Sequence, residues 1–167
     1  MRKLELVGDC GACAGLCCVA HPFDRSEDFA FDKGAGERCR HLLPNDRCAV
    51  HGRREELGCR GCVLYDCFGA GQRAVAQFAE VDQGLRDRAF LVLRGLHEQL
   101  WLLREAGKWV PPGDAGADAL RERLAAQVKE VECCAEGSAV EVAAAGDGIE
   151  RRTRAVLREV GRWLGRG

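Results

Sequence analysis

The chain has 167 residues, a formal net charge of -1 and 47% hydrophobic residues. Proteins that bind nucleic acid usually carry a basic surplus, and neither half of this chain has one. No segment approaches the roughly eighteen consecutive apolar residues of a membrane span. We therefore expect neither a nucleic-acid partner nor insertion into a membrane.

The N-terminus, MRKLELVGDC, begins with basic residues but lacks an apolar run of the length that a secretory signal requires. We therefore expect a cytoplasmic protein, and thiols in that compartment are kept reduced. An odd total of eleven cysteines also fits a disulfide framework poorly. The sequence thus favours cysteines that act as metal ligands.

Nine of the eleven cysteines lie between Cys10 and Cys67, and the first four form the run Cys10-x-x-Cys13-x-x-x-Cys17-Cys18. The Cys-x-x-Cys spacing lets two thiolates on a tight turn reach one metal ion. Zinc with four thiolates is a common outcome, and iron-sulfur clusters use similar spacings. Adjacent side chains in an extended segment point in opposite directions, so we expect Cys17 and Cys18 to serve different sites or to bridge. This run predicts two metals or a bridged centre.

The thiols continue downstream with a second Cys-x-x-Cys pair, Cys59 and Cys62. Eight thiolates complete two four-cysteine sites, and the ninth is spare. We favour Cys62 over Cys59 as the eighth metal ligand, and Cys59 and His51 are the alternative ligands. The predicted metal ligands are Cys10, Cys13, Cys17, Cys18, Cys39, Cys48, Cys62 and Cys67.

Arginines are frequent near these cysteines, and two zinc ions with eight thiolates carry a net negative charge. We expect at least two of these arginines to neutralise that charge or to donate hydrogen bonds beside the sulfurs. The spacing assigns no catalytic residue, and Asp66 is the carboxylate to test first. The arginines concerned are Arg38, Arg40, Arg47, Arg53, Arg54 and Arg60.

The segment CGACAGLCC, followed by GERCRHL and DRCAVH, resembles the bacterial YkgJ-like cysteine-cluster proteins, which are described as zinc- or iron-chelating. The resemblance covers about residues 8–72. It places Cys10, Cys13, Cys17 and Cys18 in the first block of the family pattern, and Cys39 and Cys48 in the next two blocks. Val50-His51 stands where Ile-Tyr is usual. The resemblance implies metal binding without fixing an activity.

The composition changes near Gln72, which predicts a Cys-rich metal-binding module over 1–72 and a helical region over 73–167. The first part shows no apolar periodicity, so metal ligation must supply part of its folding free energy, and we expect it to be disordered without metal. Residues 73–81 have helical composition. Residues 139–145 are either helical or irregular.

Apolar residues at alternating steps of four and three predict a helix over 85–106. Phe90, Trp101 and Leu102 widen the apolar stripe of that helix. Similar patterns predict helices over 120–135, where Asp114 is expected to provide the cap, and over 149–164. The stripe of the first helix consists of Ala89, Leu93, Leu96, Leu100 and Leu103.

These patterns together predict a mainly α protein, in which an irregular Cys-rich module packs on three or four helices. The expected function is cytoplasmic zinc or iron binding by a thiolate cluster with two metals. Two alternatives remain: an enzyme that uses iron or an iron-sulfur cluster for redox chemistry, and a module that binds a protein partner through the helical region.

Overall fold

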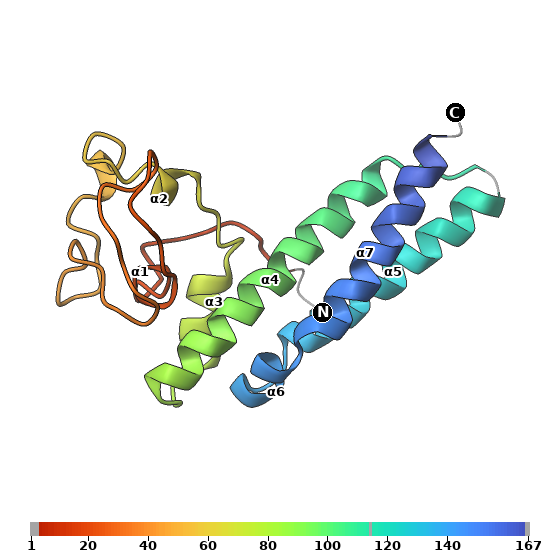
Figure 1. Ribbon diagram of the computed structural model, residues 1–167. Helices are drawn as coiled ribbons and strands as arrows, with labels where there is room; N and C mark the ends of the chain where they lie inside the picture. Colours follow the sequence, from red (N-terminus) through yellow and green to blue (C-terminus); the bar gives the residue numbers. More distant parts are fainter. Residues whose placement is uncertain (1–3, 114, 166–167) are drawn as a thin grey trace.

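The computed structural model describes residues 4–113 and 115–165 (Figure 1), and it confirms a mainly α fold. No β-strand occurs in these two ranges, although isolated antiparallel bridges join Phe23 to Lys33 and Leu42 to Cys48. The helical elements are α1 (Cys17–Ala20), the short 3-10 helix η1 (His51–Arg53), α2 (Gly61–Leu64), α3 (Ala70–Gln77), α4 (Gln83–Lys108), α5 (Ala115–Ala135), α6 (Ala139–Ala144) and α7 (Gly146–Leu164).

Helix α4 is the central element, and it confirms the helix predicted over 85–106. The side chain of Asp82 caps its first turn by accepting a hydrogen bond from the Leu85 amide at 3.0 Å. The predicted apolar stripe is buried along its whole length. Phe90 is also fully buried, whereas Trp101 and Leu102 are 42% and 38% exposed. Including these two residues in the stripe was wrong, because each is rotated about 100° or more from Leu100 around the helix axis.

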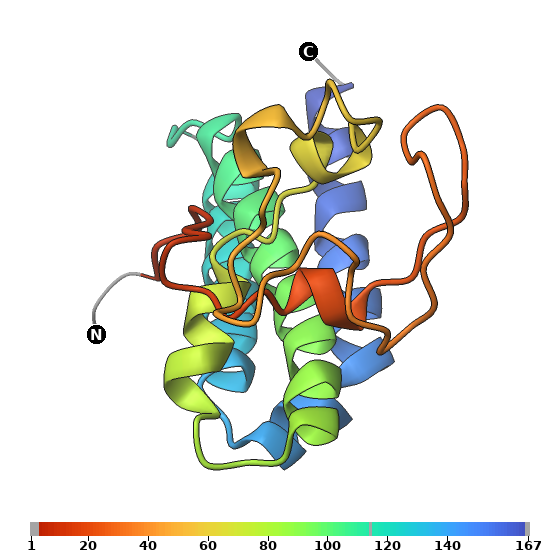
Figure 2. The same cartoon turned by 90° about the vertical axis from the view of Figure 1, so that its left-hand side faces the viewer.

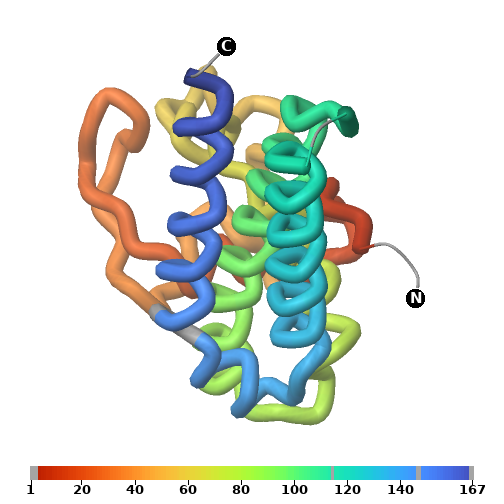
Figure 3. Tube along the Cα trace, turned by 90° about the vertical axis from the view of Figure 1, so that its right-hand side faces the viewer, coloured from red at the N-terminus to blue at the C-terminus, as the bar shows by residue number. Residues whose placement is uncertain are grey.

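Helices α5 and α7 pack on one side of α4 (Figure 3). The chain runs along α4, returns along α5 and reverses again into α7, so consecutive long helices are antiparallel while α4 and α7 run in the same direction. Leu120, Leu124 and Val131 of α5 and Ile149 and Val160 of α7 join the stripe of α4 in one apolar core.

The region 139–145, which the sequence left open, contains the helix α6. Ser138 and Glu141 form a capping box at its start: the Glu141 amide donates to the Ser138 hydroxyl, and the Ser138 amide donates to the Glu141 carboxylate. The predicted cap Asp114 lies outside the described residues.

The Cys-rich region lies on the other side of α4 from α5 and α7 (Figures 1 and 2). Helix α3 packs on α4, and Leu16 and Ala20 belong to the same core as the long helices. The change in composition at Gln72 falls inside α3, whose second residue, Gly71, lies against the Cys13 sulfur. Among the described helices, none combines the length and the apolar character needed to cross a membrane.

Candidate metal centre

A cavity of about 1090 Å³ lies inside the Cys-rich region, and all nine cysteines of that region line it. Eight of them are the predicted ligands. The ninth is Cys59, which the sequence had ranked behind Cys62; both lie on the cavity wall. The rings of Phe23, Phe31 and Phe90 form further parts of the lining. The fold therefore gathers cysteines from four distant chain segments around one space.

The first thiol set consists of Cys10, Cys13, Cys17 and Cys67, and it borders the start of α3. A methyl group at Gly71 would lie 2.7 Å from the Cys13 sulfur and 3.9 Å from the Cys67 sulfur, so both thiols lie against this glycine. Burial raises the pKa of the Cys13 thiol, and the nearby Cys67 sulfur raises it further. Burial and the nearby Cys67 sulfur also raise the pKa of the Cys10 thiol.

The second thiol set consists of Cys18, Cys39, Cys48, Cys59 and Cys62. The Cys39 amide donates a hydrogen bond to the Cys18 carbonyl at 2.9 Å, and Cys48 forms a β-bridge with Leu42. Cys59 is only 3% exposed; burial raises the pKa of its thiol, and the nearby Cys39 and Cys48 raise it further. Burial, followed by the nearby Cys59, raises the pKa of Cys62 to about 11.

The vicinal pair Cys17 and Cys18 marks the boundary between the two sets. The segment is helical and not extended as we assumed, so the two side chains are rotated by about 100° and do not point in opposite directions. Their sulfurs are 4.0 Å apart. The pKa of Cys18 is lowered to about 7, chiefly by the sulfur contact with Cys17 and then by the cations of Lys33 and Arg54. The same contact, with burial, raises the pKa of Cys17.

The thiols surround the cavity without converging on one point. Among the described His, Cys, Asp and Glu side chains, no group of three or more is spaced closely enough to hold a metal ion. The arrangement is a wall of soft ligands around a large space, and soft thiolates favour zinc, copper(I) and iron-sulfur centres.

Lys33 is a buried cation beside this wall, and no sequence pattern indicated its position. Its side chain donates hydrogen bonds to the carbonyls of Val19, His21 and Gly34 at 2.8, 2.6 and 3.1 Å. Only 5% of the residue is exposed. Two of these carbonyls belong to the end of α1, so Lys33 fixes the helix that carries Cys17 and Cys18 and places a positive charge near the second set.

Two of the six arginines contact the backbone of predicted ligands. Arg54 donates to the Cys62 carbonyl at 3.0 Å, and Arg47 donates to the Cys10 carbonyl at 2.7 Å. Both also line the cavity. These contacts restrain the segments that carry the thiols and bring positive charge to the cavity wall.

The other four arginines have different contacts. Arg40 lies over the Phe31 ring, with 4.0 Å between the guanidinium carbon and the ring centroid. The remaining three form exposed ion pairs, which contribute little to stability. These pairs are Arg38–Asp46, Arg53–Glu56 and Arg60–Asp28.

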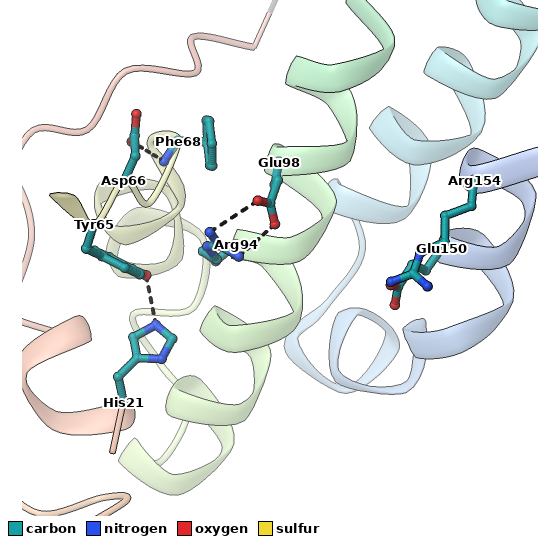
Figure 4. Close-up of polar contacts among 8 residues, drawn as sticks. All are labelled: His21, Tyr65, Asp66, Phe68, Arg94, Glu98, Glu150 and Arg154. Carbon is teal, nitrogen blue, oxygen red and sulfur yellow. Dashed lines mark hydrogen bonds and ion pairs between the residues drawn. The ribbon is translucent and has the colours of Figure 1, made fainter. Parts of the chain in front are cut away.

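A polar network joins the cavity to α4 (Figure 4). The Nε2 atom of His21 lies 2.8 Å from the Tyr65 hydroxyl, and both side chains line the cavity. Burial lowers the pKa of His21 and raises that of Tyr65, so both groups are neutral near pH 7. The guanidinium carbon of Arg94 lies 5.7 Å from the Tyr65 ring centroid, and Arg94 forms an ion pair with Glu98.

Asp66, the carboxylate selected from the sequence, accepts a hydrogen bond from the Phe68 amide at 2.7 Å. This contact stabilises the turn after Cys67 and leaves Asp66 with a structural role there. His41 and His51 also line the cavity. Cys133 and Cys134 lie on α5, outside the cavity lining.

Comparison with known proteins supplies one curated relative. The chain is 44% identical over 111 residues to the uncharacterized protein YybG of Bacillus subtilis, and the match covers 61% of this chain and 39% of YybG. The chain therefore spans well under half of that relative, whose name states no activity. No protein-family model and no solved structure matches the chain.

Proposed function

We propose that this protein binds zinc or iron through the thiolates of the Cys-rich region, and that it holds two metal centres. The observation that carries the proposal is the cavity lined by nine cysteines. Free cysteine packs as a small apolar residue, but a core does not require nine thiols around a space of this size. Thiolate ligation of metal accounts for both their number and their common orientation toward the cavity.

The charges around the cavity support the same proposal. A site with several thiolates is strongly negative, and Lys33, Arg47 and Arg54 supply fixed positive charge at its wall. The cations also hold backbone carbonyls next to ligand positions, so the thiols are oriented before a metal arrives. Such supporting contacts commonly change metal affinity by about 10- to 100-fold.

Elemental analysis combined with thiol titration tests the proposal. Protein purified without oxygen is expected to contain zinc or iron, and the nine cavity thiols are expected to react slowly with a thiol reagent until a chelator is added. Cys133 is exposed and outside the cavity, so it provides the fast-reacting reference. Cys133→Ser is the matched control and should retain the metal. Absence of both metals, with equal thiol reactivity before and after chelation, would rule the function out.

A further inference from the structure

The size of the cavity distinguishes between single ions and a larger centre. Four sulfurs at about 2.3 Å from one zinc ion are about 3.8 Å from each other, which is a closed and compact arrangement. In the part of the chain that the structure describes, no three potential ligands have such spacing, and the nine thiols lie along the wall of a cavity of about 1090 Å³. The cavity therefore leaves room for a centre larger than a single ion.

The first thiol set has the sequence organisation of a cluster site. Cys10, Cys13 and Cys17 lie within eight residues of chain, and the remote Cys67 completes the set. Iron-sulfur clusters are often held in this way, by three closely spaced cysteines and a fourth from elsewhere. In the fold, the sulfurs of Cys13 and Cys67 both lie beside Gly71 of α3.

Gly71 leaves space for these sulfurs at a cost to its own helix. Glycine inside a helix is less favourable than alanine by about 1 kcal/mol. Here a methyl group would lie 2.7 Å from the Cys13 sulfur, a distance that requires the thiol to move. A methyl group at Gly8 would similarly lie 3.2 Å from the Cys67 sulfur. The backbone thus approaches two sulfurs of the first set, those of Cys13 and Cys67, closely.

The two sets also differ in their surroundings. Cys13, Cys17 and Cys67 pack against the apolar core formed with α4, together with Leu4 and Leu6. No thiol of the second set has this contact within the described residues. Lys33 and Arg54 lie near Cys18 of that set and Arg40 lies near Cys59, while Arg54 and Arg47 also lie near Cys10 of the first set. Three of the four thiols of the first set thus lie against an apolar core, and such surroundings tune an iron-sulfur cluster.

We propose that Cys10, Cys13, Cys17 and Cys67 hold a four-iron, four-sulfide cluster, and that the second set holds the other metal. This inference rests on the proposed function, because it assigns a chemical class to one of the two metal centres. The cluster consists of ferrous or ferric ions and inorganic sulfide, and each of the four thiolates binds one iron at a corner.

Reconstitution without oxygen, using ferrous iron and sulfide on the full chain, tests this assignment. The readouts are iron, acid-labile sulfide, visible absorption and electron paramagnetic resonance after reduction. We expect about four irons and four sulfides in the cluster. Cys13→Ser and Cys67→Ser should lose most of the sulfide and the visible absorption, whereas Cys39→Ser and the control Cys133→Ser should retain both.

The outcomes separate this inference from the proposed function. Bound zinc or iron without labile sulfide would overturn the cluster and leave the metal-binding function intact, whereas absence of metal would overturn both. Equal loss of sulfide in Cys39→Ser and Cys67→Ser would overturn the division into two sets. Circular dichroism of each variant shows whether the helices remain folded, and Gly71→Ala provides a second test that leaves all ligands in place: it should also lower the sulfide content.

Discussion

The Nδ1 atom of His97, in the middle of α4, lies 2.7 Å from the carbonyl oxygen of Phe68. Phe68 follows Cys67 and has a φ of 49°, which is uncommon for a residue other than glycine. A carbonyl oxygen can only accept a hydrogen bond, so Nδ1 carries the hydrogen and donates it. This bond ties the turn after Cys67 to the helical core, and it links the position of a predicted ligand to the longest helix.

The protonation of His97 is expected to make stability dependent on pH. Burial lowers the pKa of His97, and Nε2 has no hydrogen-bond partner among the described residues. The unfolded chain, with a histidine pKa near 6.5, therefore binds a proton before the folded chain does. Stability from this group is complete above about pH 6.5 and is lost as the pH falls toward the folded-state pKa.

His97→Asn should retain the bond to Phe68, because its amide nitrogen takes the place of Nδ1, and it should remove this titration. We expect the slope of unfolding free energy against pH, between about pH 6.5 and 5, to decrease by up to about 1.4 kcal/mol per pH unit. Urea denaturation at a series of pH values measures this slope. Since burial also lowers the pKa of His21, part of the wild-type slope should remain. An identical slope in both proteins would contradict the prediction.

Lys33→Met should destabilise the protein, because three backbone carbonyls lose a charged donor in a site that is only 5% exposed. We expect a loss of about 2–4 kcal/mol in unfolding free energy. Lys108→Met is the matched control: this lysine pairs with Glu105 while its side chain is 67% exposed, so its removal should change stability by less than about 1 kcal/mol. Similar losses in the two variants would show that the carbonyl contacts of Lys33 contribute little.

Arg54→Gln and Arg53→Gln separate two adjacent arginines that the sequence did not distinguish. Arg54 donates to the carbonyls of His51 and Cys62, whereas the Arg53 side chain is 68% exposed and pairs with Glu56. We expect Arg54→Gln to weaken metal affinity by about tenfold or more, and Arg53→Gln to leave it nearly unchanged. Competition with a chromophoric chelator measures both affinities. The prediction fails if the two variants bind metal equally well.

Gly71→Ala and Gly95→Ala compare a glycine beside the thiols with one in open space. Nothing lies within 4 Å of a methyl group at Gly95 in α4, so alanine there should stabilise the protein by about 0.5–1 kcal/mol. At Gly71 the same gain in helix propensity is opposed by the contact with Cys13. Thermal unfolding should therefore show a higher midpoint for Gly95→Ala alone. Equal stabilisation by both would show that the Cys13 thiol adjusts freely.

Much of the helical region followed from local sequence. The stripe on α4 repeats at the helical period, and burial of that face against any apolar partner stabilises a helix whatever the partner is. The positions of Trp101 and Leu102 could not be obtained in the same way. They are apolar and close to the stripe, but their exposure depends on which arc of α4 the neighbouring helices cover.

The residues of the candidate site could likewise be predicted only in part from the sequence. Cysteine spacing by itself determined which residues to expect at a metal centre, because ligand chemistry depends on residue type and short spacing. Tertiary structure alone decided that Cys17 and Cys18 lie on a short helix with their sulfurs 4.0 Å apart, that Cys59 shares the cavity wall, and that Lys33 is a buried cation beside it. The physical reason is that irregular segments have no repeating period. Their side chains are placed by long-range contacts, such as those of Lys33 and Gly71, which no local pattern records.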